Sequence, residues 1–318
     1  MPQTRRNKIF FGLGTIGRDM FYTTVATYLI YYLTDILDLS DATMWWMTLI
    51  LTVLRIFDAL NDPVMGMVVD NAGGKFGKFK PMIVLGALLG AAFMVPMFMD
   101  FGLGQTAYLL LFTFLYLGWD IFFGANDIAY WSMLPALSVH PAEREKIGAF
   151  ARICANIGMY AVVVGILPVT GMLTQALGSA KQAWFVFALG TAVLMLLFQM
   201  FTVVGVREQR DVFKKEEKSG LRDLVVLLRG NDQLRYTIIS MGLFMIGYVT
   251  TTGFGVHFFK YAFGDEGKYP VFAGVLGIAQ LSALLVFPLL SRRLERSRLY
   301  SLSMLLVVAG YLVFFFSP

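Results

Sequence analysis

The sequence predicts an all-α membrane protein that crosses the bilayer many times, and three observations predict it. Of the 318 residues, 58% are hydrophobic and 15% are charged, and the mean hydropathy is +0.68. Soluble domains carry about 25% charged residues, so this composition excludes a soluble enzyme, a disordered chain and a nucleic-acid-binding domain. Nine apolar runs have the length that a helix needs to cross a bilayer. Strands are not expected, because an open sheet cannot satisfy its backbone hydrogen bonds in lipid.

The nine runs alternate with polar connections whose basic residues predict the orientation. The predicted spans cover residues 9–34, 43–69, 81–99, 106–137, 147–173, 182–206, 236–262, 270–291 and 299–316. Twenty of the 26 Lys and Arg residues lie in the N-terminal tail and the even-numbered connections, and only three lie in the odd-numbered ones. Because basic connections stay in the cytoplasm, we expect a multi-pass protein of the plasma (cell inner) membrane with a cytoplasmic N-terminus. We therefore expect the lipid bilayer as a partner of the protein and expect no binding of nucleic acid.

The longest connection, residues 207–235, divides the chain into six spans and then three. Its apolar stripe at near-helical spacing predicts an amphipathic helix on the cytoplasmic surface and consists of Leu221, Leu224, Val225, Leu227 and Leu228. The run Gly12–Gly17 in the first span reappears as Gly242–Gly247 in the seventh, as in transporters built from two parallel six-helix repeats. We therefore expect an N-terminal six-helix half (1–206), a linker (207–235) and a partial C-terminal half of three helices (236–318), in a chain truncated by three helices.

Ionisable residues inside the predicted spans carry the functional signal. Eight lie in the first five spans: Arg18, Asp19, Arg55, Asp58, Asp62, Asp120, Asp127 and Arg152. Each costs roughly 2.5–3.5 kcal/mol at the centre of a membrane helix, so a role is expected for them. One interpretation is a set of internal salt bridges that only orient helices, and it fits Arg55 best. However, five acids against three bases leave at least two carboxylates unpaired, which is the chemistry of a proton or sodium site.

Two helical faces divide these charges into two predicted sites. Arg55, Asp58 and Asp62 share a face of the second span, beside Asn61. Pro63 frees a backbone carbonyl one turn earlier, so this face suits a small monovalent cation. In the fourth span, a second face places a carboxylate one turn from an indole, which suits a sugar, and it consists of Asp120, Gly124, Asp127 and Trp131. The alternative for Trp131 is an interfacial membrane anchor.

The connection after the second span is a tight basic turn. Asp70 is followed by Lys75, Lys78 and Lys80, with glycines between them. Its basic residues fit cytoplasmic anchoring, and they also fit a gating turn in which Asp70 and Lys78 hold a neighbouring helix. One Cys and two His cannot build a disulfide framework or a multi-ligand Zn or Fe–S site. No nucleotide-binding loop or nucleophile–base arrangement is present, so we expect no cofactor and no enzyme.

Four sequence blocks in residues 10–155 resemble a known transporter family. They are Gly17–Asp19, Arg55–Pro63 with Met65, Gly66, Asp70 and Gly77–Pro81, then Asp127–Ser132, and finally Glu143–Glu145 with Arg152. Together they resemble the glycoside–pentoside–hexuronide:cation symporters, the melibiose-permease-like branch of the major facilitator superfamily. The resemblance implies the major facilitator fold. It also implies secondary active sugar transport by alternating access, driven by a coupling cation that is H⁺ or Na⁺.

The resemblance also implies roles for individual residues. Asp58, Asn61 and Asp62 fall on cation-site positions, and would be the metal ligands if sodium is the coupling ion. The expected sugar-site residues are Asp19, Asp127, Trp131 and Arg152, with Arg18 in place of a basic residue beside them. Gly124 stands where sodium-coupled members can have a threonine ligand, and Asp120 stands where a small residue is common. We therefore add Asp120 to the expected cation site and favour a proton.

The function expected from the sequence is thus cation-coupled symport of a glycoside or related sugar. Two alternatives are left open. One is a membrane sensor or receptor that binds a sugar without moving it, and the other is a transporter of an amphipathic, lipid-like solute. An intramembrane enzyme ranks below both.

Overall fold

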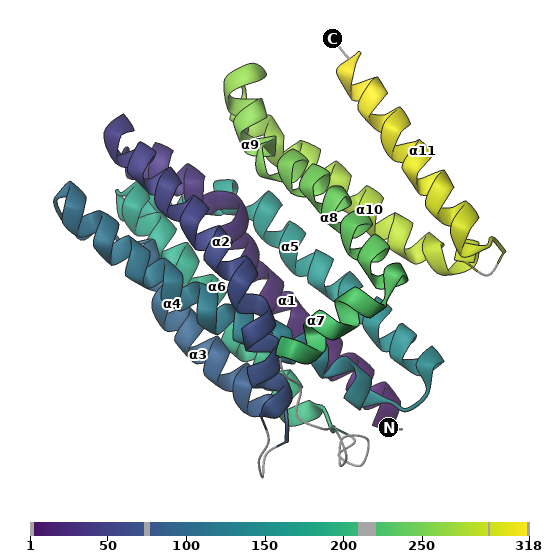
Figure 1. Cartoon of the computed structure of the whole chain (residues 1–318). Coiled ribbons are helices and arrows are strands. Elements are labelled where there is room, and N and C mark those ends of the chain that lie inside the picture. The colour runs from purple at the N-terminus through teal and green to yellow at the C-terminus, as the bar shows by residue number, and fades with distance from the viewer. Residues whose placement is uncertain (1–2, 73–76, 209–220, 292, 317–318) are drawn as a thin grey trace. The chain divides into compact units, whose positions relative to one another are not determined.

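A computed structural model describes residues 3–72, 77–208, 221–291 and 293–316 (Figure 1). In this part of the chain every regular element is helical, which confirms the predicted all-α class. The long helices are α1 (Gln3–Tyr31), α2 (Asp41–Asn71), α3 (Lys80–Met97), α4 (Gln105–Ser132), α5 (Pro141–Leu177), α6 (Ala180–Gly205), α8 (Asp232–Gly253), α10 (Tyr269–Ser291) and α11 (Arg296–Phe315). The short elements are α7 (Leu221–Gly230), α9 (Gly255–His257), the 3-10 turns Leu134–Leu137 and Glu266–Lys268, and the π-helical turns Tyr32–Ile36 and Phe258–Ala262.

All nine predicted spans fall on helices, but their number differs from the spans counted in the structure. By length and composition, six helices of the described ranges could cross a membrane: α2, α3, α4, α5, α6 and residues Tyr269–Phe287 of α10. The other three predicted spans correspond to α1, α8 and α11. α1 contains Arg18 and Asp19 among many Gly, Thr and Tyr residues, which lowers its mean hydropathy. The seventh predicted span is also not continuous, because α8 ends at Gly253 and the short α9 and a π-helical turn follow it.

Local sequence signals explain where several of these helices begin and end. The side chain of Ser40 accepts a hydrogen bond from the Thr43 N–H and caps α2, and Ser179 does the same for α6 through Gln182. Pro141 opens α5, where a missing N–H is harmless. At the other end of α5, Gly178 adopts φ +70°, a left-handed conformation that favours glycine.

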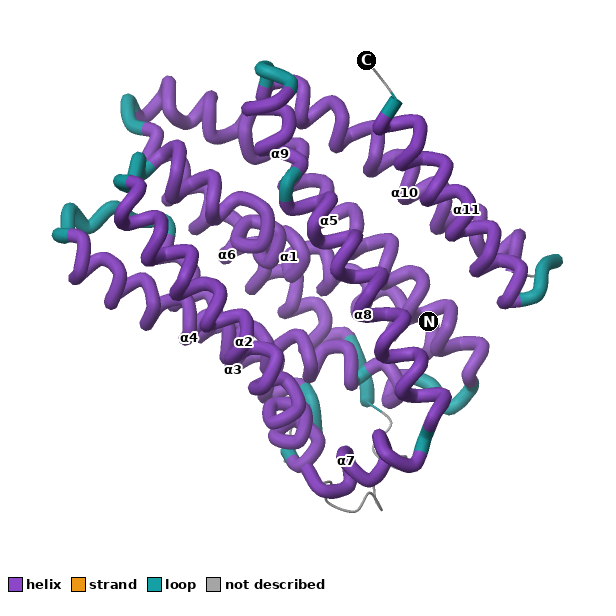
Figure 2. The backbone as a smooth tube through the Cα atoms, turned by 45° about the horizontal axis from the view of Figure 1, so that its top comes forward, coloured by secondary structure: helices purple, strands orange, loops and turns teal. Residues whose placement is uncertain are grey.

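The first six helices form one packed bundle that positions the charged residues. α1 packs against α5 and α6, and α4 packs against α2 and α3 (Figure 2). At Gly17 the backbones come very close, because a Cβ atom there would lie 2.6 Å from the Leu194 carbonyl oxygen of α6. A buried amide pair ties α4 to α6, since Asn126 and Gln199 exchange two hydrogen bonds of 2.8 Å. The close contact at Gly17 fixes one side of α1 against α6, and the opposite side of α1 carries Asp19.

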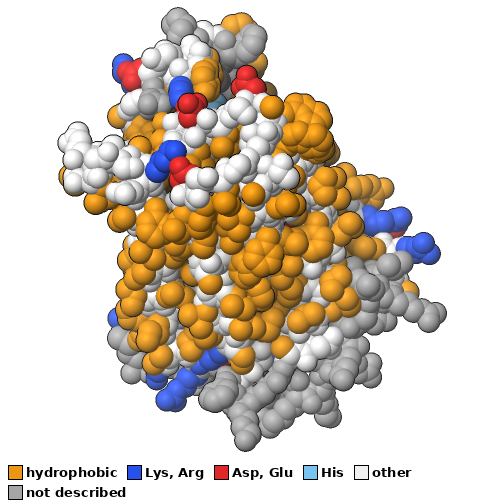
Figure 3. Space-filling view, turned by 90° about the vertical axis from the view of Figure 1, so that its left-hand side faces the viewer, with side chains coloured by type: hydrophobic (Ala, Val, Ile, Leu, Met, Phe, Trp, Pro, Cys, Tyr) orange, Lys and Arg blue, Asp and Glu red, His pale blue; other side chains and the backbone are white. Residues whose placement is uncertain are grey.

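The surface agrees with a membrane environment. Figure 3 shows one face of the molecule, on which hydrophobic side chains cover a broad middle belt and the Lys, Arg, Asp and Glu side chains gather towards its ends. Large apolar side chains exposed on α2 and α4 include Val53, Leu60, Leu110 and Phe114. A soluble protein does not expose a continuous apolar belt of this kind, so the chain is a multi-span membrane protein.

The described chain forms two compact units, residues Met1–Ala273 and Gly274–Pro318. The second unit holds the rest of α10 and all of α11. The predicted division into 1–206, 207–235 and 236–318 stays a prediction. A helix, α7, does lie within the predicted amphipathic stretch, with Leu227 exposed and Leu228 half-buried. The side chains of Leu221, Leu224 and Val225 lie outside the described residues, as does the charged segment 214–218.

Candidate functional site

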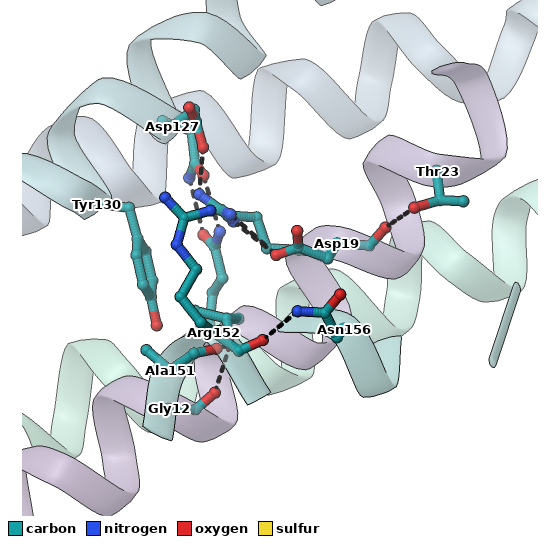
Figure 4. Close-up of polar contacts among 12 residues, drawn as sticks. Gly12, Asp19, Thr23, Asp127, Tyr130, Ala151, Arg152 and Asn156 are labelled. Atoms are coloured by element: carbon teal, nitrogen blue, oxygen red, sulfur yellow. Dashed lines mark hydrogen bonds and ion pairs between the residues drawn. The ribbon is translucent and has the colours of Figure 1, made fainter. Parts of the chain in front are cut away.

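The first cluster of charges is centred on Arg18 of α1. Arg18 is only 4% exposed, and it forms ion pairs with the carboxylates of Asp19 and Asp127, which are labelled in Figure 4. Nε and Nη2 donate to Asp19 Oδ2 at 3.2 and 2.9 Å, and Nη1 forms an ion pair with Asp127 Oδ1 of α4. The guanidinium therefore joins α1 to α4 and forms an ion pair with both acids.

Aromatic rings and a second arginine complete this cluster, which we call the Arg18 cluster and define as Arg18, Asp19, Asp127, Tyr130, Trp131 and Arg152. The Arg18 guanidinium carbon lies 5.3 Å from the Tyr130 ring centre and 5.0 Å from that of Trp131. Arg152 of α5 lies 4.4 Å from the Trp131 ring centre and is exposed. All five predicted sugar-site residues are thus brought together, and Trp131 lies among charged groups rather than alone at a membrane boundary.

Tyr130 belongs to this site although the sequence did not single it out. It is fully buried, and its hydroxyl donates to the Phe11 carbonyl oxygen and lies 2.8 Å from Thr202 Oγ1. It thereby fixes the end of α4 against α1 and α6. Its position directly before Trp131 could have indicated that it belongs to the site. However, the chain has 14 tyrosines, and nothing else in the sequence distinguishes this one.

The second cluster consists of the carboxylates of α2 and α4 together with Arg55. Asp120 of α4 interacts electrostatically with Asp58 and Asp62 of α2, and Arg55 Nη1 lies 3.9 Å from Asp58 Oδ2. Asp120 is 7% exposed, and its Oδ2 has no hydrogen-bond partner among the described residues. We call this group of Arg55, Asp58, Asp62 and Asp120 the Asp58 cluster. It holds three acids and one base.

Asp62 and Asn61 complete the predicted cation-site residues. A Cβ atom added to Gly124 would lie 4.0 Å from Asp62 Oδ1, so Gly124 faces Asp62 across the α2–α4 contact. Asn61 is half-buried on the same turn of α2. Within the described ranges, no three His, Cys, Asp or Glu side chains gather closely enough to hold a metal ion. The carboxylates are therefore neighbours and do not form a closed cage in this conformation.

The basic turn after α2 is held by contacts that connect distant parts of the chain. Lys78 Nζ lies 3.6 Å from Asp70 Oδ1, so the predicted gating residues form an ion pair. The Lys78 backbone N–H donates to Glu208 Oε2 at 3.0 Å, and Lys80 Nζ donates to the Val206 carbonyl oxygen at 2.7 Å. Gly77 adopts φ +110°, and a Cβ atom there would lie 2.8 Å from the Glu208 carboxylate. Glu208 thus positions the basic turn. The sequence did not indicate this contact, because Glu208 lies 130 positions after Lys78.

The helical bundle and its two charge clusters define a polytopic membrane protein with ionisable side chains inside its spans. The sequence profile of the family described as MFS/sugar transport protein matches residues 10–318, and the chain belongs to this family. The predicted resemblance is thereby confirmed, and the intramembrane enzyme is excluded.

Individual relatives are named as sugar carriers. The chain is 30% identical to the lactose permease of Lactobacillus delbrueckii subsp. bulgaricus, over 97% of this chain and 51% of the relative. It is 28% identical to the raffinose carrier protein of Pediococcus pentosaceus, over 96% and 50%, and 24% identical to the isoprimeverose transporter of Lactiplantibacillus pentosus, over 95% and 62%. The chain therefore spans about half the length of the first two relatives.

Proposed function

We propose that this protein carries a glycoside or related sugar across the plasma membrane together with a monovalent cation, by alternating access, with its N-terminus in the cytoplasm. The observation that carries the proposal is the Arg18 cluster, where a buried guanidinium holds two carboxylates beside an indole ring. Sugar hydroxyl groups both donate and accept hydrogen bonds, and the C–H face of a sugar packs on aromatic rings. The cluster offers acceptors, donors and a ring within one site.

The balance of charge in this cluster favours a neutral ligand. Arg18 and Arg152 offset Asp19 and Asp127, so binding an uncharged sugar leaves no surplus charge in the membrane interior. The relatives bearing the names lactose permease, raffinose carrier protein and isoprimeverose transporter support an oligosaccharide. We propose lactose as the first substrate to test.

The Asp58 cluster supports coupling to a cation. Asp58, Asp62 and Asp120 outnumber Arg55, so one positive charge would bring the group closer to neutrality. Neighbouring carboxyl groups can share one proton, whereas sodium needs several oxygen ligands at fixed distances. Gly124 provides no side-chain oxygen beside Asp62. These features favour the proton over sodium. A change of Asp120→Gly with Gly124→Thr removes the extra acid and adds a hydroxyl beside Asp62, so it should shift coupling towards sodium.

The coupling follows from electrostatics. A charged or half-filled site is costly to move through the low-dielectric centre of the membrane. A chain with both ligands bound, or with neither, reorients more easily than one with a single ligand, which links cation movement to sugar movement. We propose that the Asp70–Lys78 pair, together with Glu208, holds the cytoplasmic gating turn during this change.

Counterflow of labelled lactose in vesicles containing the intact chain tests the proposal. Preloaded unlabelled lactose should drive transient accumulation of the label, and lactose addition without sodium should raise the external pH. Saturable lactose binding without exchange would indicate a receptor. Exchange of an amphipathic solute, but not of lactose, would assign a lipid-like substrate. Strict sodium dependence without a pH change would overturn the proton and identify Asp120 as a substitute sodium ligand.

A further inference from the structure

An ion pair that neither charge cluster uses joins the end of α1 to the segment after α8. Lys260 Nζ contacts Asp35 Oδ1, and both residues belong to the compact unit Met1–Ala273. Each lies in a π-helical turn, Asp35 in Tyr32–Ile36 and Lys260 in Phe258–Ala262. Such turns interrupt helices and often mark functional positions. The pair therefore bridges two helix ends that are 225 positions apart in the sequence.

The surroundings make this pair stronger than an ordinary surface contact. The Asp35 side chain is 12% exposed and that of Lys260 is 27% exposed. The Thr34 hydroxyl donates to Asp35 Oδ2 at 2.5 Å, and Lys260 Nζ lies 5.3 Å from the Tyr31 ring centre and 5.4 Å from that of Tyr261. Little water can screen a pair placed in this way, so separating it has a real energetic cost.

Aromatic packing directly beside the pair extends the contact between the two regions. The Phe259 ring centre lies 5.9 Å from that of Tyr269. Tyr269 is 5% exposed and belongs to the same apolar core as Tyr28 and Tyr31 of α1 and Trp184 of α6. The segment after α8 is thus anchored on the six-helix bundle by an apolar contact, and the ion pair lies at the edge of that contact.

The position of the pair indicates which end of the bundle it closes. α1 begins near the end of α6, where Asn7 exchanges hydrogen bonds with the Arg207 backbone, and it runs to Tyr31 at the opposite end. In Figure 1 α7 and α9 lie at opposite ends of the bundle. The Asp70–Lys78 turn follows α2, which runs back towards the start of α1. The Asp35–Lys260 pair is therefore at the end remote from the gating turn.

We propose that Asp35 and Lys260 form a latch that closes the outer end of the protein, by tying the predicted N-terminal half to the predicted C-terminal part. This inference rests on the proposed alternating access and adds the residues that hold one of its closed states. Breaking the pair releases the segment Gly255–Lys268 from the end of α1 and favours a state in which the Arg18 cluster is reached from outside.

Accessibility of a single cysteine measures the latch without requiring transport. Ala26 is exposed on α1 between Asp19 and Asp35, and the one native cysteine, Cys154, is buried. In the intact chain carrying Cys154→Ser and Ala26→Cys, a membrane-impermeant maleimide is added to whole cells or to inside-out vesicles. Asp35→Asn or Lys260→Gln should raise labelling from outside by roughly fivefold, the size expected for losing a partly desolvated ion pair. The exchange Asp35→Lys with Lys260→Asp should restore the parental rate.

Neighbouring charges provide matched controls. Asp38→Asn and Lys268→Gln remove an exposed charge from the same two regions and should leave labelling unchanged. Parental labelling rates in both single variants, with the protein inserted, would overturn the latch. Because the labelling reaction needs neither added sugar nor transport, a chain that transports no lactose can still show the increase. If the protein transports lactose but Asp35→Asn and Lys260→Gln leave labelling unaltered, the latch is refuted and the proposed transport is not.

Discussion

The two charge clusters lie about two turns apart along one face of α4, at Asp120 and at Asp127, and they differ in their balance of charge. In the Arg18 cluster, Arg18 bonds directly to both Asp19 and Asp127, and Arg152 lies beside Trp131. In the Asp58 cluster, Arg55 approaches only Asp58, at 3.9 Å, while Asp120 keeps an unpartnered oxygen among the described residues. A balanced, bonded cluster suits a neutral ligand with many hydroxyl groups. A cluster with surplus negative charge suits a cation. The difference teaches that one helical face can carry two unlike charge clusters, because its two levels meet different numbers of arginines.

Removing the central base of the balanced cluster should have the largest effect. Arg18→Ala leaves Asp19 and Asp127 as adjacent carboxylates without their base, and loss of one partner of a buried pair costs about 3 kcal/mol or more. We expect a lower midpoint of thermal unfolding in detergent and no lactose counterflow. Arg18→Lys keeps the charge and should unfold close to the parental temperature, although one ammonium cannot bond both acids in the same way. An unchanged unfolding midpoint for Arg18→Ala would contradict the assigned role of the pair.

Neutralising the acidic cluster should separate coupling from exchange. Asp58→Asn or Asp62→Asn lowers the surplus of negative charge, so uphill accumulation driven by a cation gradient should be lost, while counterflow, which needs no gradient, persists. Accumulation and counterflow measured in the same vesicles give the comparison. Asp41→Asn, an exposed acid at the start of the same helix, is the matched control and should accumulate lactose normally. Normal accumulation in Asp58→Asn would remove that residue from the cation site.

Truncating the indole should weaken sugar binding and leave the cation site intact. Trp131→Ala removes the ring that faces Arg18 and Arg152, and loss of such contacts lowers affinity by roughly tenfold. Isothermal titration with lactose measures this affinity. Trp131→Phe keeps an aromatic ring and should retain part of it. Trp46→Ala, which removes an exposed indole near the start of α2, is the control. Equal lactose affinity in Trp131→Ala and the parent protein would make Trp131 an interfacial anchor.

The smallest effect concerns an ion pair outside both clusters. Asp100 accepts hydrogen bonds from Lys181 Nζ at 2.6 Å and from the Gly102 N–H at 2.9 Å, and these bonds lower the pKa of Asp100. A lowered pKa gives stability that is present above the pKa of the unfolded chain, about 3.9, and is lost as the pH falls through the lowered value. Because the pair is exposed, Asp100→Asn should cost less than about 1 kcal/mol at pH 7. The difference in unfolding free energy between Asp100→Asn and the parent should vanish in strong acid. A difference that grows as the pH falls would contradict a lowered pKa for Asp100.

The helical architecture and most residues of the two charge clusters could be predicted because their signals are local. An apolar run of about 20 residues specifies a membrane helix without reference to the rest of the chain. The spacing of Arg55, Asp58 and Asp62 specifies a shared helical face. The burial cost of each charge then predicts a role for it from the sequence alone.

Only the tertiary structure decided which charges meet. The sequence offered three bases to five acids inside the first five predicted spans, and packing of α1 against α4 gave Arg18 two of the acids while leaving Arg55 with Asp58. Glu208 and Lys260 were invisible as partners of Lys78 and Asp35 because helix packing, not sequence spacing, brings them together. Hydropathy determines that a segment is a helix in lipid. Which side chains approach one another depends on how helices far apart in the chain rotate and tilt against each other. Close contacts of small residues, as at Gly17 against α6, set these orientations. The orientations are therefore a property of the whole bundle.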